Sequence, residues 1–226
     1  VNTLESFKKE KDRTYKSDDW FQWSEGRVSF GRKPTNNTSS RDIHSHGISI
    51  GADKIKRDNR DVMYGYVFQY GNENIDIGSR GTNLNTDSYS LAIYGTKIED
   101  NDYFTDGIIG LNLLDIDHKR VINGNTLKGV RDGQQIFSSI NFGKRLHEDE
   151  INFNPGIKLD LGYTKLEAFR EKTTLGNSLS DSLIYRDQNI KTALATIGVL
   201  FDTTDKEDEK IINHHGRLEY LSLIHI

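Results

Sequence analysis

The chain of 226 residues contains no cysteine, only two prolines and no long hydrophobic run. Without cysteine, neither a disulfide framework nor a thiolate metal site can form. A transmembrane helix is also excluded, because its apolar run would need roughly 18 or more residues. The scarcity of proline favours extended structure, since proline removes hydrogen bonds from a β-ladder. These absences leave an all-β domain as the main expectation.

The charge and hydropathy of the chain narrow the class of protein less strongly. The net charge of −4 gives no electrostatic basis for binding nucleic acid. A mean hydropathy of −0.68 does not argue for a soluble protein, because polar loops and lumens keep the average low in β-barrels. The chain starts at Val1 rather than methionine, so we expect a fragment, and the missing signal peptide says little about localisation.

One stretch, residues 156–163, alternates strictly between apolar and polar residues. Side chains of a β-strand point to opposite faces with a period of two, so this strand has one apolar and one polar face. The apolar positions are Ile157, Leu159, Leu161 and Tyr163, and the charged positions are Lys158 and Asp160. A half-buried strand of a soluble sandwich and a strand of a membrane barrel both match this pattern.

The same alternation returns along the chain and predicts about nine strands. We expect them at residues 20–31, 47–52, 62–70, 89–93, 104–114, 134–143, 156–163, 189–201 and 217–221. Long polar connections are expected near Asn37, Gly78, Gly124 and Asn177, and short ones near Asn59, Asp100 and Asp149. Membrane barrels carry short turns on one rim and long loops on the other, whereas a Greek-key sandwich has no such alternation. The pattern therefore predicts an antiparallel up-and-down transmembrane β-barrel.

Six short motifs in order resemble the C-terminal β-domain of bacterial autotransporters, the translocator of type V secretion. They are Trp23-x-x-Gly26 with Ser29-Phe30-Gly31, residues 47–53, Tyr64-Gly65-Tyr66, Tyr89-Ser90-Leu91, Phe104-x-Asp106-Gly107 and Pro155-Gly156-Ile157-Lys158-Leu159. The resemblance implies a twelve-strand barrel in the outer membrane of a Gram-negative bacterium, with both termini periplasmic and a helical linker in the lumen. It implies no cofactor and no reaction, and the partners would be outer-membrane lipid, the chain's own passenger segment and the barrel assembly machinery.

This resemblance divides the chain into three parts. Residues 1–19 are a charged leader or lumen linker, residues 20–221 are an incomplete barrel, and residues 222–226 are a non-native tail. With about nine of twelve strands present, we expect the strands near Val28 and Leu218 to be unpaired at the edges of an open, curved sheet.

The alternation also assigns the two faces of the expected barrel. The lumen-facing residues would be Arg27, Lys158, Asp160, Arg217 and Glu219. The lipid-facing residues would be Ile157, Leu159, Leu161 and Tyr163, because Lys158 in hydrocarbon would be costly. Candidates for the aromatic girdles at the membrane interfaces are Tyr70, Tyr94, Phe104 and Tyr163.

Other motifs point to no site for catalysis or metal binding. The histidine pairs His44-x-His46 and His214-His215 have no third ligand nearby in sequence. Asp115-x-Asp117 and Asp202-x-x-Asp205 lack the glycine and glutamate of a calcium loop, and Gly124 to Gly129 lacks the lysine of a phosphate loop. No Gly-x-Ser-x-Gly nucleophile elbow occurs. The sequence leaves two alternatives: a porin-like or adhesin-type barrel without passenger, and a soluble β-sandwich binding module.

Overall fold

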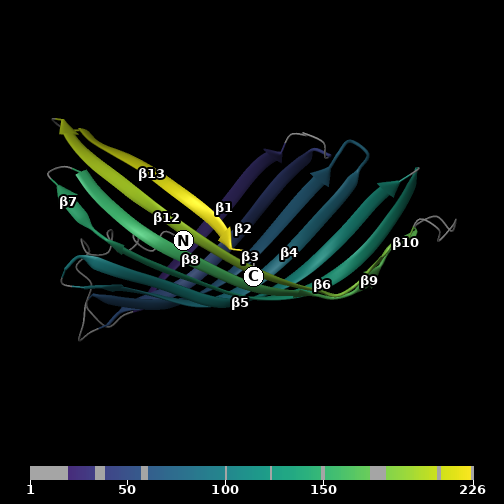
Figure 1. Ribbon diagram of the computed structural model, residues 1–226, viewed down its shortest axis with the longest axis horizontal. Coiled ribbons are helices and arrows are strands. Elements are labelled where there is room, and N and C mark those ends of the chain that lie inside the picture. Colours follow the sequence, from purple (N-terminus) through teal and green to yellow (C-terminus); the bar gives the residue numbers. More distant parts are fainter. Residues whose placement is uncertain are drawn as a thin grey trace.

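In the computed structural model, the chain forms one strongly curved antiparallel sheet, an open half-barrel (Figure 1). The structure describes residues 20–33, 39–56, 61–99, 101–122, 124–148, 151–173, 182–207 and 210–224. Residues 1–19 and the sequence predictions at Asn37, Asn59, Asp100, Asp149 and Asn177 lie outside this part of the chain. Within it, no helix is long and apolar enough to cross a membrane.

Nine long strands follow one another across the sheet in chain order. They are β1 (Phe21–Lys33), β2 (Arg41–Ile55), β3 (Val62–Ile77), β4 (Thr82–Ile98), β5 (Tyr103–Ile122), β6 (Asn125–Lys144), β8 (Ile151–Leu166), β12 (Gln188–Glu207) and β13 (Lys210–Ile224). Short strands extend this sheet: β7 (Leu146–Glu148) pairs with β8, and β10 (Lys172–Thr173) pairs with β6. β9 (Phe169–Arg170) and β11 (Ile184–Tyr185) form a separate pair.

The predicted up-and-down order and the open edges are both confirmed. Each long strand pairs antiparallel with its neighbour in sequence, and β1 and β13 each have a partner on one side only among the described strands. A Greek-key sandwich would require strands that cross between two sheets. The arrangement therefore contradicts the soluble sandwich considered from the sequence.

The predicted alternation of long and short connections is wrong for the turns that the structure describes. β3 and β4 are joined by Gly78–Gly81, and β5 and β6 by residues 123 and 124, so two expected long loops are tight turns. Positive φ angles at Gly78, Gly81 and Gly124 suit such turns, because glycine has no Cβ to clash. The polar stretches beside them continue the strands, and β5 and β6 reach 20 residues each.

These polar extensions distinguish the two ends of the sheet. We call the end with the turns at Gly78–Gly81 and Gly124 the far rim, and the end with Asp61 and Asp102 the near rim. Toward the far rim, cross-strand amide and carboxylate contacts replace apolar packing: Asn72 Nδ2 donates to Asp87 Oδ1 at 3.0 Å and Asn83 Nδ2 to Asn74 Oδ1 at 2.8 Å. This side-chain pairing explains why the polar stretches form strands.

The register gives the sheet two chemically different faces. One row of directly paired residues runs Phe68, Leu91, Leu111, Ile136 and Tyr163 across β3 to β8. The exposed fraction of these five side chains lies between 40% for Tyr163 and 60% for Leu111. The opposite face is concave, because residues from β3 through β13 border a single cavity there. The apolar row therefore lies on the convex face.

Candidate functional site on the concave face

The concave face holds all five charged residues that the alternation assigned to the lumen, and four of them border one cavity. Lys158, Asp160, Arg217 and Glu219 border a cavity of about 600 Å³ that also reaches β3. Lys158 Nζ lies 3.0 Å from Asp160 Oδ1, and Arg217 Nε lies 3.3 Å from Glu219 Oε2. Arg27 shares this face by register but lies on β1, at the opposite edge of the sheet. The structure thus brings four of the five together.

A hydrogen-bonded chain of neutral polar side chains crosses the middle of the concave face. Ser90 Oγ donates to Asn112 Oδ1 at 3.0 Å, and Asn112 Nδ2 lies 3.5 Å from Gln135 Oε1. Gln135 Nε2 then donates to Thr164 Oγ1 at 2.9 Å. The four residues come from β4, β5, β6 and β8 and are directly paired in register. Because each amide gives and accepts a hydrogen bond, the row is polar without carrying charge.

Near the near rim, Tyr94 links Trp23 to the buried carboxylate of Asp53. Tyr94 OH accepts from Trp23 Nε1 at 2.9 Å and donates to Asp53 Oδ2 at 2.7 Å. Asp53 is 4% exposed and Tyr94 8% exposed, and Tyr94 packs with Met63 and Val67 in a small apolar cluster. This part of the concave face is therefore a packed core in which Tyr94 holds one oxygen of the Asp53 carboxylate, while Oδ1 has no hydrogen-bond partner among the residues that the structure describes.

A second buried carboxylate, Asp106, lies on β5 in the same half of the face. Thr96 Oγ1 donates to Asp106 Oδ1 at 2.8 Å, and Asn141 Nδ2 donates to Oδ2 at 3.2 Å. Both donors are direct neighbours of Asp106 in the register of β4 and β6. The carboxylate is therefore held by donors from the strands on both sides of β5.

At the far rim, Glu171 is fully buried against β5. Arg120 donates to both carboxylate oxygens, with Nε to Oε1 at 2.9 Å and Nη2 to Oε2 at 2.6 Å. The backbone N–H of Leu183 donates to Oε2 at 3.0 Å, so the returning arm before β12 is tied to the same group. The Arg120 hydrogen bonds hold the pKa of Glu171 below its usual range. His118 lies 3.5 Å from Glu171 Oε1, yet burial lowers the pKa of His118 more than Glu171 raises it.

Aromatic rings pack beside this ion pair. Phe169 and Tyr185 stack with ring centroids 4.5 Å apart, and the guanidinium of Arg131 lies 5.7 Å from the Phe169 ring. Phe169 lies directly over Gly129, where a Cβ atom would clash with the ring. The short strand β9, with Tyr185 of β11 stacked on it, is thereby packed against β6 on the concave side.

Several of these residues were not predicted from the sequence. Tyr94 and Phe104, proposed as girdle aromatics, are buried on the concave face, because they pair in register with Gly65 and Gly143 rather than with the apolar row. Tyr70 and Tyr163 do lie on the convex face. Asp53 and Asp106 stand at positions of β2 and β5 that point to the concave face, and the period-two alternation of these strands could have assigned them to that face. Glu171 lies in a stretch read as loop and gave no signal.

The side chains offer no arrangement suited to metal binding in the part of the chain that the structure describes. No group of three or more His, Asp or Glu residues converges there. His44, His46, Asp115 and Asp117 all lie in strands, and Gly124 forms a turn. The side chains of His214, His215 and Asp205 lie outside the described set.

Three comparisons bear on this architecture. A family model described as "Autotransporter beta-domain" matches residues 22–222. The fold is similar to the translocator domain of autotransporter NalP from Neisseria meningitidis, with a TM-score of 0.69 and 14% identity over 98% of this chain and 81% of that one. It is also similar to the β-domain of the Bordetella autotransporter BrkA, with a TM-score of 0.65 and 15% identity over 92% and 81%. No curated protein sequence matches the chain.

Proposed function

The chain belongs to the autotransporter β-domain family, and from this premise we propose how its two faces work. It is an outer-membrane translocator of type V secretion, and its sheet is part of the transmembrane barrel. Membership of a family of transport barrels is consistent with a protein that is not an enzyme. We propose that it acts as conduit and anchor for a passenger and catalyses no reaction.

The observation that carries this proposal is the contrast between the faces. The convex row centred on Leu111 is exposed and apolar, which suits contact with lipid. The concave face carries Lys158, Asp160 and the neutral polar row through Asn112, which suits a wet lumen. Through the apolar part of the sheet, each long strand from β2 to β12 is paired on both sides, as hydrocarbon requires, and β1 and β13 form the open edges. Ile157, Leu159, Leu161 and Tyr163 therefore face lipid in this proposal.

The same contrast suggests the partners of the two faces. Outer-membrane lipid covers the convex face, and the passenger segment crosses the concave one, where Arg27, Lys158, Asp160, Arg217 and Glu219 supply charge. Insertion would depend on the barrel assembly machinery, as for other members of the family. Trp20, immediately before β1, lies at the near rim, which we place in the periplasm.

Single cysteines at adjacent positions of β8 test the assignment of faces, because the chain has no cysteine of its own. Lys158→Cys in the assembled full-length protein should react with a small water-soluble maleimide. Leu159→Cys should resist that reagent and react with a lipid-soluble one. Equal labelling of both positions by the water-soluble reagent would contradict the proposal.

A further inference from the structure

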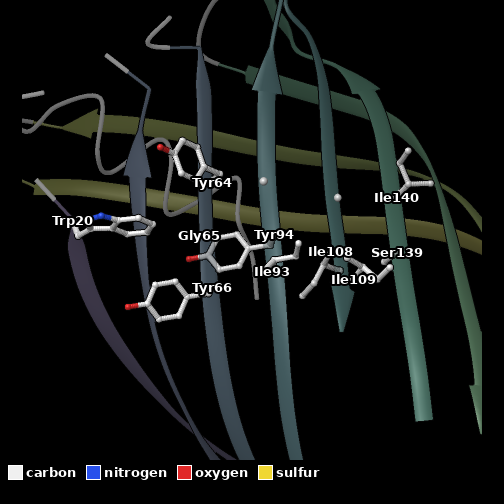
Figure 2. Close-up of a pocket in the computed structure, with 12 residues that line it drawn as sticks. Trp20, Tyr64, Gly65, Tyr66, Ile93, Tyr94, Ile108, Ile109, Ser139 and Ile140 are labelled. Carbon is white, nitrogen blue, oxygen red and sulfur yellow. The ribbon is translucent and has the colours of Figure 1, made fainter. Parts of the chain in front are cut away.

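The convex face is interrupted by a groove near the near rim (Figure 2). Tyr64, Gly95, Gly107 and Ile140 pair directly across β3, β4, β5 and β6, so two neighbouring positions of this apolar row carry no side chain. The resulting cavity of about 550 Å³ runs across the strands. Trp20, Tyr64 and Tyr66 gather at one end of it, and Ile109 and Ile140 lie toward the other.

The aromatic end of the groove is a built feature of the fold. The Trp20 ring lies 5.9 Å from that of Tyr64, edge to face, and 5.6 Å from that of Tyr66. Trp20 immediately precedes β1, and its ring reaches past β2 to contact rings on β3. About half of each of these three side chains is exposed, so the rings form a wall that stands out from the sheet beside the glycines.

Lysines lie on the convex face between this groove and the near rim. Lys54 pairs directly with Tyr64, and Lys97 is the next residue after Gly95 on the same face of β4. Lys144 Nζ lies 5.0 Å from the centre of the Tyr103 ring, farther along the same rim. Lys97 contacts Glu99 at 2.9 Å, but both side chains are more than half exposed, and such a pair stabilises little and can exchange for another anion.

Toward the far rim the convex face has the opposite character. Asp87, Asp115 and Asp132 pair directly across β4, β5 and β6 just beyond the apolar rows. The positions next to the apolar surface are therefore carboxylates toward the far rim, with Lys119 and Lys128 two positions farther out, whereas the groove opens directly beside lysines. An apolar slot next to ammonium groups matches a molecule with a hydrocarbon chain and an anionic head.

We propose that the groove holds one acyl chain of an anionic phospholipid, with the phosphate beside Lys54 and Lys97. This inference rests on the proposed function, because it requires the convex face to lie in lipid. In hydrocarbon an acyl chain gains no hydrophobic free energy from entering the groove. It gains contacts with the glycine backbone and the aromatic wall that a bulky or badly fitting neighbour would lose. The lysines then select the headgroup.

Photo-crosslinking in vesicles tests the site. The full-length protein is reconstituted into phosphatidylcholine vesicles that contain a small fraction of phosphatidylglycerol with a diazirine in its acyl chain. Peptide mass spectrometry should find crosslinks enriched in residues 93–109 over residues 193–201, a convex segment outside the groove. Gly107→Leu should abolish the enrichment, and it should fold, because a Cβ at Gly107 has no neighbour closer than 4.0 Å. Ser138→Leu places a leucine at a convex position that does not line the groove, and it should leave the enrichment unchanged.

The lysine arm of the experiment tests the headgroup. Replacing Lys54 and Lys97 by glutamine should raise the lipid fraction needed for half-maximal crosslinking, roughly fivefold for each lysine removed, which corresponds to about 1 kcal/mol per lysine near an anionic surface. The matched pair Lys119→Gln and Lys128→Gln, at the far rim, should have no such effect. Uniform crosslinking over the convex face would overturn the lipid site while leaving the proposed function intact. Crosslinks confined to the concave face would overturn the proposed function itself.

Discussion

Leu111 and Asn112 are neighbours in β5, yet they belong to regions of opposite chemistry. Leu111 stands in a convex row with Leu91 and Ile136, and its stabilisation depends on what surrounds the sheet. Asn112 stands in a concave row where its partners, Ser90 and Gln135, belong to the sheet itself. The stability of the convex face therefore depends on the medium around the sheet, whereas the concave face is stabilised by hydrogen bonds within the sheet. The same charged substitution should therefore lower the free energy of unfolding by different amounts on the two faces.

The largest effect should follow from placing a charge on the convex face. Leu111→Arg should destabilise the assembled full-length protein by roughly 2–4 kcal/mol, the cost of arginine near the bilayer midplane. Denaturant unfolding in vesicles and heat-modifiable migration on gels would measure it. Asn112→Arg is the control one residue away, and it should cost about 1 kcal/mol through its lost hydrogen bonds. Equal costs would show that the two faces share one environment.

A smaller effect should follow from breaking the ion pair of the far rim. Glu171→Gln removes the bidentate contact with Arg120 and should cost roughly 2 kcal/mol, less than for a fully enclosed pair because the Arg120 side chain keeps 19% exposure. Hydrogen exchange at the amide of Leu183 should accelerate. Glu167→Gln, an exposed site in the same arm, removes the same charge and should leave exchange unchanged. Similar exchange in both variants would show that the ion pair does not hold the arm.

The Tyr94 bridge tests the packed part of the concave face. Tyr94→Phe removes the hydroxyl between Trp23 and Asp53 and should cost about 1–2 kcal/mol, because the buried carboxylate loses a donor. Trp23 fluorescence should change with it. Tyr64→Phe, on the convex face, alters the same group without a buried partner and should be close to neutral. A neutral Tyr94→Phe would mean that water reaches Asp53.

Acid should loosen the far rim before it affects the rest of the sheet. The pKa values of Glu171 and His118 both lie below their ordinary values of 4.5 and 6.5, so the folded state binds fewer protons than the unfolded one. The stability from both groups is present above those ordinary values and is lost as pH falls through the lowered ones. Leu183 exchange, corrected for its intrinsic pH dependence, should rise below about pH 6.5. His118→Gln should remove the upper part of this change, and an unaltered profile would exclude His118.

The smallest effect should come from Lys158. Lys158→Gln keeps a polar group in the cavity and removes only a half-exposed ion pair with Asp160, so it should change stability by less than about 0.5 kcal/mol. Unfolding of the assembled protein would measure this. A cost near that of Leu111→Arg would show that the pair is enclosed.

The sequence sufficed for the order of strands and for both faces of β8, because a period of two survives in every apolar segment. The register of β8, β12 and β13 puts Arg217 on the same face as Lys158, as the alternation in each strand predicts. The polar ends of β3 to β6 were misread as loops, since Asn72 and Asp87 signal a strand only through each other. Tyr94 and Phe104 were misassigned because aromatic residues suit either face. Glu171 could not be found, because its partner Arg120 lies 51 residues earlier.

The tight turns at Gly78–Gly81 and Gly124 have a consequence for how the sheet assembles. Each long strand pairs with the next long strand along the chain, and apart from the β8–β12 pair these ladders close short stretches of polypeptide. The entropy lost in closing a loop grows with its length, so each of these short-range pairings costs little before its hydrogen bonds form. Hairpins of this kind form within roughly 1–10 μs in water. The sheet can therefore grow by successive local steps, and each completed hairpin provides the edge on which the next strand forms.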